Sequence, residues 1–73
     1  MNFAKRATVE RSDFYVRRIW TADDGVHRVS EFKSKLERRT VFYAERRDAS
    51  GWDYISQHRR RGPALAACQR DGN

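Results

Sequence analysis

The stretch DFYVRRIWTADDGVHRVSEF, residues 13 to 32, predicts the centre of the fold. Two runs rich in aromatic and β-branched residues flank the dipeptide Asp24-Gly25, a pattern that is typical of a β-hairpin. We expect strands over residues 13 to 22 and 26 to 32. A two-residue type I′ turn, which needs positive φ at both central positions, would join them.

The position of the turn also determines which residues of the two strands lie opposite each other. Trp20 then faces Val29, and Arg18 faces Glu31, which gives an aromatic/β-branched pair and a pair of opposite charges. Because side chains alternate along a strand, one face carries Phe14, Val16 and Trp20 and is expected to be core. The other face mixes arginine with apolar groups and is expected to be surface or a contact surface; it carries Tyr15, Arg17, Ile19 and Arg28.

The segment that follows the hairpin allows two interpretations. Ser34 and Glu37 have the spacing of a capping box, which predicts a helix over residues 34 to 49. The β-prone run TVFY at 40 to 43 instead favours a strand over residues 39 to 46. We take the helix as the main prediction and the strand as the alternative.

These elements together predict a small α+β domain. The run WDYISQ, residues 52 to 57, is expected to be a strand that returns to the sheet, which gives the order β-β-α-β: a three-stranded antiparallel sheet with one helix and flexible termini. The strand alternative gives an all-β four-stranded meander. Residues 1 to 12 are expected to be an N-terminal arm or edge strand, residues 13 to 59 the folded domain, and residues 60 to 73 a flexible C-terminal tail.

Length and composition limit what this chain can be. Its 73 residues, 38% of them hydrophobic, suffice for one small domain with a stability of roughly 3 to 5 kcal/mol. No apolar run reaches the roughly 18 residues of a membrane span, and the N-terminus lacks the apolar region of a secretory signal. We therefore expect a cytoplasmic location.

Residues that could catalyse a reaction or bind a metal are few. Cys68, His27 and His58 are the only sulfur and imidazole ligands, and none of them has the close spacing of a zinc site. The four glycines are scattered, so a glycine-rich phosphate loop is absent. Asp23 and Asp24 are expected to be solvated at a hairpin tip, and Cys68 lies in the expected tail. We expect no catalytic residue, no cofactor and no metal, and hence no enzyme.

The chain is strongly basic, with a net charge of +6 that comes from sixteen Lys and Arg against ten Asp and Glu. Thirteen of the sixteen are arginine. A GC-rich genome would explain this, and so would a binding surface, because the planar guanidinium pairs with phosphate or carboxylate and stacks on aromatic rings. The expected helix would carry a basic flank for phosphates or acidic surfaces, or a merely solvated face, formed by Lys35, Arg38, Arg39, Arg46 and Arg47.

The whole chain, from MNFAKRATVERSDFYVRRIWTADDGVHRVSEF to the short C-terminal segment, resembles the small early transcription regulators of lytic Xanthomonas phages in length and sequence. We expect a monomer, and the resemblance implies that it binds bacterial RNA polymerase at the N-terminus of the β′ subunit and at the β flap. Such a protein displaces the σ factor during initiation and acts as an antiterminator near the RNA exit channel, where it could also touch nucleic acid. The resemblance supplies no motif that assigns contact residues.

The residue chemistry is compatible with that function. A basic domain can be steered to acidic surfaces and then held by apolar anchors. The candidate partner-binding residues are Tyr15, Arg17, Ile19, Trp20 and Arg28, although Trp20 is also an expected core residue. Charge alone fits a nonspecific DNA- or RNA-binding protein equally well, and an inhibitor of another host enzyme is a third hypothesis.

Overall fold

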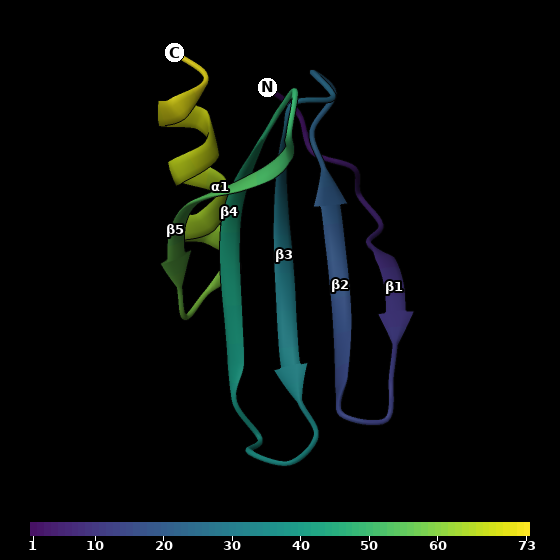
Figure 1. Cartoon of the computed structure of the whole chain (residues 1–73). Helices are drawn as coiled ribbons and strands as arrows, with labels where there is room; N and C mark the ends of the chain where they lie inside the picture. The colour runs from purple at the N-terminus through teal and green to yellow at the C-terminus, as the bar shows by residue number, and fades with distance from the viewer.

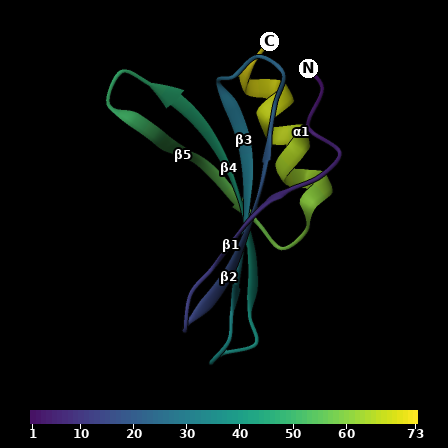
Figure 2. The same cartoon turned by 90° about the vertical axis from the view of Figure 1, so that its right-hand side faces the viewer.

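The structure, a computed structural model, describes residues 1–73 and contains one five-stranded antiparallel sheet and one helix (Figure 1). The elements are β1 (Thr8–Arg11), β2 (Tyr15–Thr21), β3 (His27–Ser34), β4 (Thr40–Asp48), β5 (Gly51–His58) and α1 (Arg61–Asp71). Each strand pairs with the next one along the chain, and α1 covers one face of the sheet (Figure 2). The predicted three-stranded β-β-α-β fold is therefore wrong, and the four-stranded meander lacks one strand and the helix.

The register of the central hairpin, β2 with β3, is as the sequence predicts. Trp20 pairs with Val29 and Arg18 with Glu31. Arg18 Nη1 donates to Glu31 Oε1 over 3.0 Å. The hairpin therefore presents alternate residues to opposite faces of the sheet, as expected.

The turn of this hairpin differs from the expected type I′. Only Gly25, with a φ of 70°, has positive φ there, and Asp24 does not. The backbone N–H of Ala22 donates to the oxygen of His27 over 2.9 Å, so the connection is a four-residue loop. Asp24 Oδ1 accepts from the N–H of both Val26 and His27, and this side chain stabilises the longer loop.

Residues 34 to 49 form a turn and then a strand, so the predicted helix is wrong. Ser34 Oγ accepts from the N–H of Leu36 and Glu37, at 3.3 and 3.1 Å, which is half of the expected capping box. The chain then leaves the helical path at Arg38, whose φ is 51°. The capping interaction is local and forms a loop as readily as the first turn of a helix.

Strand pairing decides the conformation of the next segment. In β4 the side chains of Phe42 and Ala44 are buried beneath α1, while Val41 and Tyr43 alternate to the other face. Both edges of β4 are used, because it pairs with β3 and with β5. These nonlocal bonds outweigh the local signal for a helix.

The C-terminal segment is a docked helix and not a flexible tail. Pro63 lies in the first turn of α1, where the missing N–H has no helical partner in any case. Ala64, Ala67 and Cys68 follow at helical spacing and are buried against the sheet. Small side chains bury little apolar area, and for this reason the sequence predicts a flexible tail here. In the structure the same small side chains let the helix approach the sheet closely.

The N-terminus is also fixed to the sheet, so it is an edge strand with a short lead-in and not an arm. β1 pairs with β2 along its length. Before it, Phe3 forms a bridge with Ala22, and the N–H of Ala4 donates to the oxygen of Thr21 over 2.9 Å. Phe3 also packs against the margin of the core.

One hydrophobic core lies between the sheet and α1. Trp20, predicted to be core, is 9% exposed and belongs to this cluster. The cluster consists of Trp20, Val29, Phe42, Ala44, Ala64, Ala67 and Cys68. The helix above it is neither long nor apolar enough to cross a membrane.

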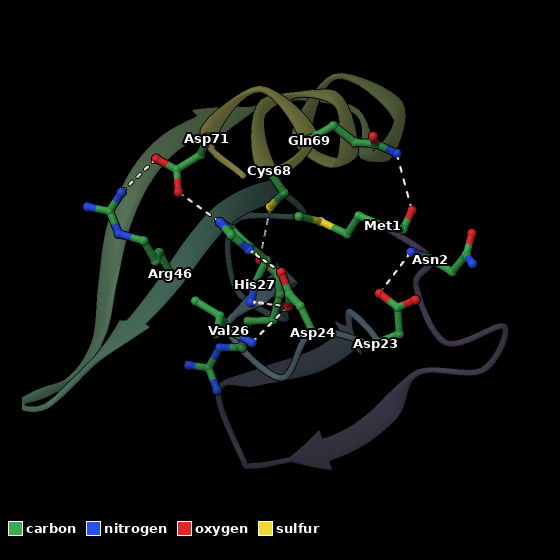
Figure 3. Close-up of polar contacts among 11 residues, drawn as sticks. Met1, Asn2, Asp23, Asp24, Val26, His27, Arg46, Cys68, Gln69 and Asp71 are labelled. Carbon is green, nitrogen blue, oxygen red and sulfur yellow. Dashed lines mark hydrogen bonds and ion pairs between the residues drawn. The ribbon is translucent and has the colours of Figure 1, made fainter. Parts of the chain in front are cut away.

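A polar latch fastens the C-terminal end of α1 to the loop between β2 and β3 (Figure 3). His27 Nδ1 lies 2.7 Å from Asp24 Oδ2, and its Nε2 lies 2.8 Å from Asp71 Oδ2. Arg46 Nη1 also pairs with Asp71 Oδ1, over 2.7 Å. The side chain of His27 is 5% exposed, so the two carboxylates are its main polar surroundings.

The latch shifts the pKa values of its members. Burial would lower the pKa of His27, but the hydrogen bonds to Asp71 and Asp24 outweigh it, so the pKa is raised. The hydrogen bond with His27 lowers the pKa of Asp24 to about 2. The same imidazole, and then Arg46, lower the pKa of Asp71.

We predict that deleting α1 unfolds the domain. A chain that ends at Arg60 would expose Val29 and Ala44, which are fully buried in the structure. We expect the cooperative thermal transition in circular dichroism to disappear, whereas a control chain that lacks only Asn73 should keep it. A cooperative transition in the chain ending at Arg60 would show that the sheet does not need its cover.

We predict that stability is greatest at mildly acidic pH. Because its pKa is raised, His27 stabilises the fold fully at pH values below its ordinary pKa of 6.5. This stabilisation is lost as the pH rises through the pKa of the folded state. Asp24 and Asp71 have lowered pKa values, so they stabilise the fold at pH values above their ordinary pKa of 3.8. This stabilisation is lost as the pH falls through the pKa values of the folded state. The melting midpoint should therefore peak between about pH 4 and 6.5.

The matched variant for this prediction is His27→Gln, which keeps hydrogen-bonding groups but cannot take up a proton. Its melting midpoint should lack the fall on the alkaline side that the natural protein shows. An equal fall in both proteins would contradict the assignment of the titration to His27.

Candidate functional site

The face of the sheet opposite α1 is uncovered, and we call it the open face. Figure 2 shows the helix on one side of the sheet only. The strand register places alternate residues of the four longer strands on the open face. They include Tyr15, Arg17, Ile19, Arg28, Ser30, Phe32, Val41, Tyr43, Glu45 and Tyr54.

A row of four aromatic rings crosses the open face, with one ring from each of β2 to β5. The ring centroids of Tyr15 and Phe32 lie 5.4 Å apart, those of Phe32 and Tyr43 5.7 Å, and those of Tyr43 and Tyr54 6.1 Å. Such tilted and edge-to-face pairs stabilise neighbouring strands. Tyr15 is 37% exposed and Tyr54 is 62% exposed, so both ends of the row reach solvent.

An ionic network centred on Glu45 lies beside the aromatic row. Its Oε1 accepts from Arg28 Nε over 3.0 Å and from the Ser30 hydroxyl, and it lies 3.8 Å from Arg17 Nη2. Arg17 also packs 4.8 Å over the Phe32 ring, and Arg28 packs 4.2 Å over Trp52. Both guanidinium groups are thus fixed in place beside Glu45, whose single negative charge offsets one of their two positive charges.

The row and the network meet at a shallow hollow in the open face. Its lining consists of Arg17, Phe32, Tyr43, Glu45 and Tyr54. Three aromatic rings give apolar contact area, while the guanidinium and the carboxylate offer a donor and an acceptor. This combination suits a protruding side chain of a protein partner.

The structure separates the five predicted anchor residues. Tyr15, Arg17 and Arg28 lie together on the open face, and Ile19 lies there too but is only 8% exposed. Trp20 is on the other face, buried in the core with the Arg61 guanidinium 5.0 Å from its ring centroid. Of the five, only Tyr15 is well exposed, while the side chains of Arg17 and Arg28 are 19% and 15% exposed.

The sequence analysis missed four residues of this surface: Phe32, Tyr43, Glu45 and Tyr54. For Tyr43 and Glu45 the cause is the helix predicted over residues 34 to 49, which removes both from the sheet. The alternative strand over residues 39 to 46, indicated by the β-prone run TVFY, would have placed them on the sheet.

The predicted basic flank is also divided. Arg46 and Arg47 lie at the far end of β4, and Arg46 is paired with Asp71. Lys35 Nζ donates to the backbone oxygen of Ser12 over 2.7 Å. Only Arg38 and Arg39 remain together, and the structure adds Arg59 to them, as residues that line a second hollow.

The described side chains do not gather into a metal site, since no group of three His, Cys, Asp or Glu could hold an ion. The single thiol, Cys68, is fully buried. Burial raises its pKa, which disfavours the nucleophilic thiolate.

Comparisons of the chain with protein-family models, with curated proteins and with solved structures gave no match. The surfaces described above are therefore the basis for assigning a function.

We predict that Glu45 is the structural centre of the open face. Glu45→Ala removes the carboxylate from two guanidinium groups whose side chains are only 19% and 15% exposed. Leaving such groups without a partner costs about 1 to 3 kcal/mol. The control is Glu10→Ala, whose side chain is 53% exposed and pairs with Arg17 at 3.7 Å; we expect about 0 to 1 kcal/mol there. Equal losses in urea unfolding would refute the prediction.

Proposed function

We propose that this chain is a transcription regulator that binds bacterial RNA polymerase through its open face. The observation that supports a protein partner is the exposed aromatic row with fixed arginines on a sheet face that no other part of the chain covers. Tyrosine and arginine are enriched among the residues that dominate protein interfaces. The fixed side chains lose little conformational entropy on binding.

The identity of the partner rests on the resemblance to the phage regulators. In this proposal the chain is a binding protein and not an enzyme, and it works without a cofactor in the cytoplasm of the bacterial host. It engages the N-terminus of the β′ subunit and the β flap, displaces σ during initiation and promotes read-through during elongation. The excess of basic residues would speed association with acidic surfaces of the polymerase.

A polymerase interface sets a requirement on the size of the contact surface. A stable interface buries about 800 Å² on each partner, roughly 15% of the 5325 Å² of accessible surface of this chain.

The test is in vitro transcription with Xanthomonas RNA polymerase, the protein being added before promoter engagement or after promoter escape. We expect initiation by the σ-containing holoenzyme to fall at near-stoichiometric protein, whatever the excess of competitor DNA. An elongation complex without σ should continue and pass intrinsic terminators more often. Inhibition that follows only the amount of DNA, or equal inhibition of both stages without read-through, would refute the proposal.

The surface itself is tested with Tyr15→Ser combined with Tyr54→Ser. Both side chains are exposed, so the fold should persist, and we expect the protein concentration needed for half-inhibition to rise at least about tenfold. The control is Leu36→Ser, which removes an apolar side chain that is 79% exposed in the loop between β3 and β4. A loss as large in the control would contradict the choice of the open face.

A further inference from the structure

Four arginines of the strands are paired with carboxylates: Arg17 with Glu10 and Glu45, Arg18 with Glu31, Arg28 with Glu45 and Arg46 with Asp71. The other arginines form no ion pair, and they include Arg11 and Arg47 in the strands. Among them, Arg38, Arg39 and Arg59 line one hollow. We call these three arginines the basic end.

The basic end is a built hollow and not a scatter of surface charges. The residues before β4 and those at the end of β5 lie side by side because Phe42 pairs with His58. The hollow between them is lined by Arg38, Arg39, Thr40, Val41, Gln57, His58 and Arg59. No carboxylate belongs to this lining, and Val41 is its only apolar member.

The backbone supports this arrangement. Arg38 has a φ of 51°, a conformation that glycine would adopt with less strain. The N–H of Ser34 donates to the oxygen of Arg39 over 2.9 Å and closes the loop that carries both arginines. The two arginines therefore start from one fixed loop beside the hollow that both of them line.

Five of the ten acidic residues lie towards the opposite end of the sheet, in or beside the loop between β2 and β3, the turn between β4 and β5 and the end of α1 (Figure 1). These residues are Asp23, Asp24, Asp48, Asp53 and Asp71. The others include Asp13 and Glu37, which lie in the loops at the same end as Arg38 and Arg39. The hollow itself has no carboxylate in its lining, so an anionic polymer would meet no negative charge there.

We propose that the basic end binds the phosphate backbone of a nucleic acid without reading its bases. A planar guanidinium forms paired hydrogen bonds with phosphate oxygens, and three of them surround one hollow. An acidic protein surface is the weaker candidate because protein interfaces have an apolar core, which this hollow lacks. Nucleic-acid interfaces are polar and positively charged. The proposal does not depend on what the open face binds.

The experiment measures fluorescence anisotropy of a labelled oligouridylate of about 20 nucleotides, and of duplex DNA of equal length, over a range of salt concentrations. The variant is Arg39→Gln combined with Arg59→Gln. Each lost phosphate contact should lower the slope of log affinity against log salt by about 0.7 on the single strand or 0.9 on the duplex. A lower salt slope on either probe supports the proposal, and the probe that binds more tightly identifies the form of nucleic acid.

The matched control is Arg6→Gln combined with Arg47→Gln, which removes the same charge from two exposed arginines outside the basic end. An equal change in slope for both double variants would mean that only net charge matters, and would overturn the proposal. An unchanged salt slope in Arg39→Gln combined with Arg59→Gln would also overturn the proposal. So would binding of the protein to an acidic polypeptide without binding to either nucleic-acid probe.

Two further measurements keep the result interpretable. Arg39→Lys combined with Arg59→Lys keeps the charges but not the planar donors, so the salt slope should persist while the affinity falls. Tyr15→Ser combined with Tyr54→Ser should leave nucleic-acid binding unchanged. Failure of the polymerase proposal would thus appear in transcription alone, and failure of this proposal in anisotropy alone.

Discussion

The need to cover one face of a single twisted sheet shapes this molecule. Val29 and Ala44 have no accessible surface, and they are shielded from solvent because α1 lies across them. The helix can come so close because Ala64, Ala67 and Cys68 are small, while Trp20 and Phe42 fill the flanks of the same layer. A chain of this length has one helix for two faces. The opposite face must therefore be stable in contact with solvent. Aromatic pairs and an arginine–glutamate network stabilise it in place of a second apolar layer.

The sequence predicts those parts of the fold that local patterns determine. Alternation around Asp24-Gly25 predicts the β2–β3 register correctly, and the aromatic run after Gly51 predicts β5. The errors at residues 34 to 49 and at the C-terminus have different physical origins. At Ser34 the capping hydrogen bond does form, but a single local bond does not decide between a loop and a helix when pairing on both edges of the next strand competes. In α1 the decisive contact is the close approach of small side chains, which a count of apolar area undervalues.

The same distinction applies to the candidate surfaces. Tyr15, Arg17 and Arg28 were predicted because they alternate on one hairpin. The rings of Tyr43 and Tyr54 join them only through the pairing of β3, β4 and β5, and Arg59 joins Arg38 and Arg39 for the same reason. Basic residues that look uniform in the sequence are sorted by the fold into neutralised and unpaired groups. The fold thus converts one composition into two chemically different surfaces, an aromatic face suited to a protein and a basic hollow suited to phosphates.

The buried position of Cys68 makes the docking of α1 observable. Its sulfur lies 3.5 Å from the backbone oxygen of Arg28 beneath the helix, where a reagent cannot reach it. Because it is the only cysteine, modification by a thiol-reactive dye would report a single site, the one that the docked helix covers. When closing is faster than modification, the labelling rate gives the free energy of the opening that exposes Cys68, whether the helix lifts alone or the domain unfolds with it. The rate of Cys68 modification therefore measures how often the core is exposed, and it can be compared with the open face free and with a partner bound to it.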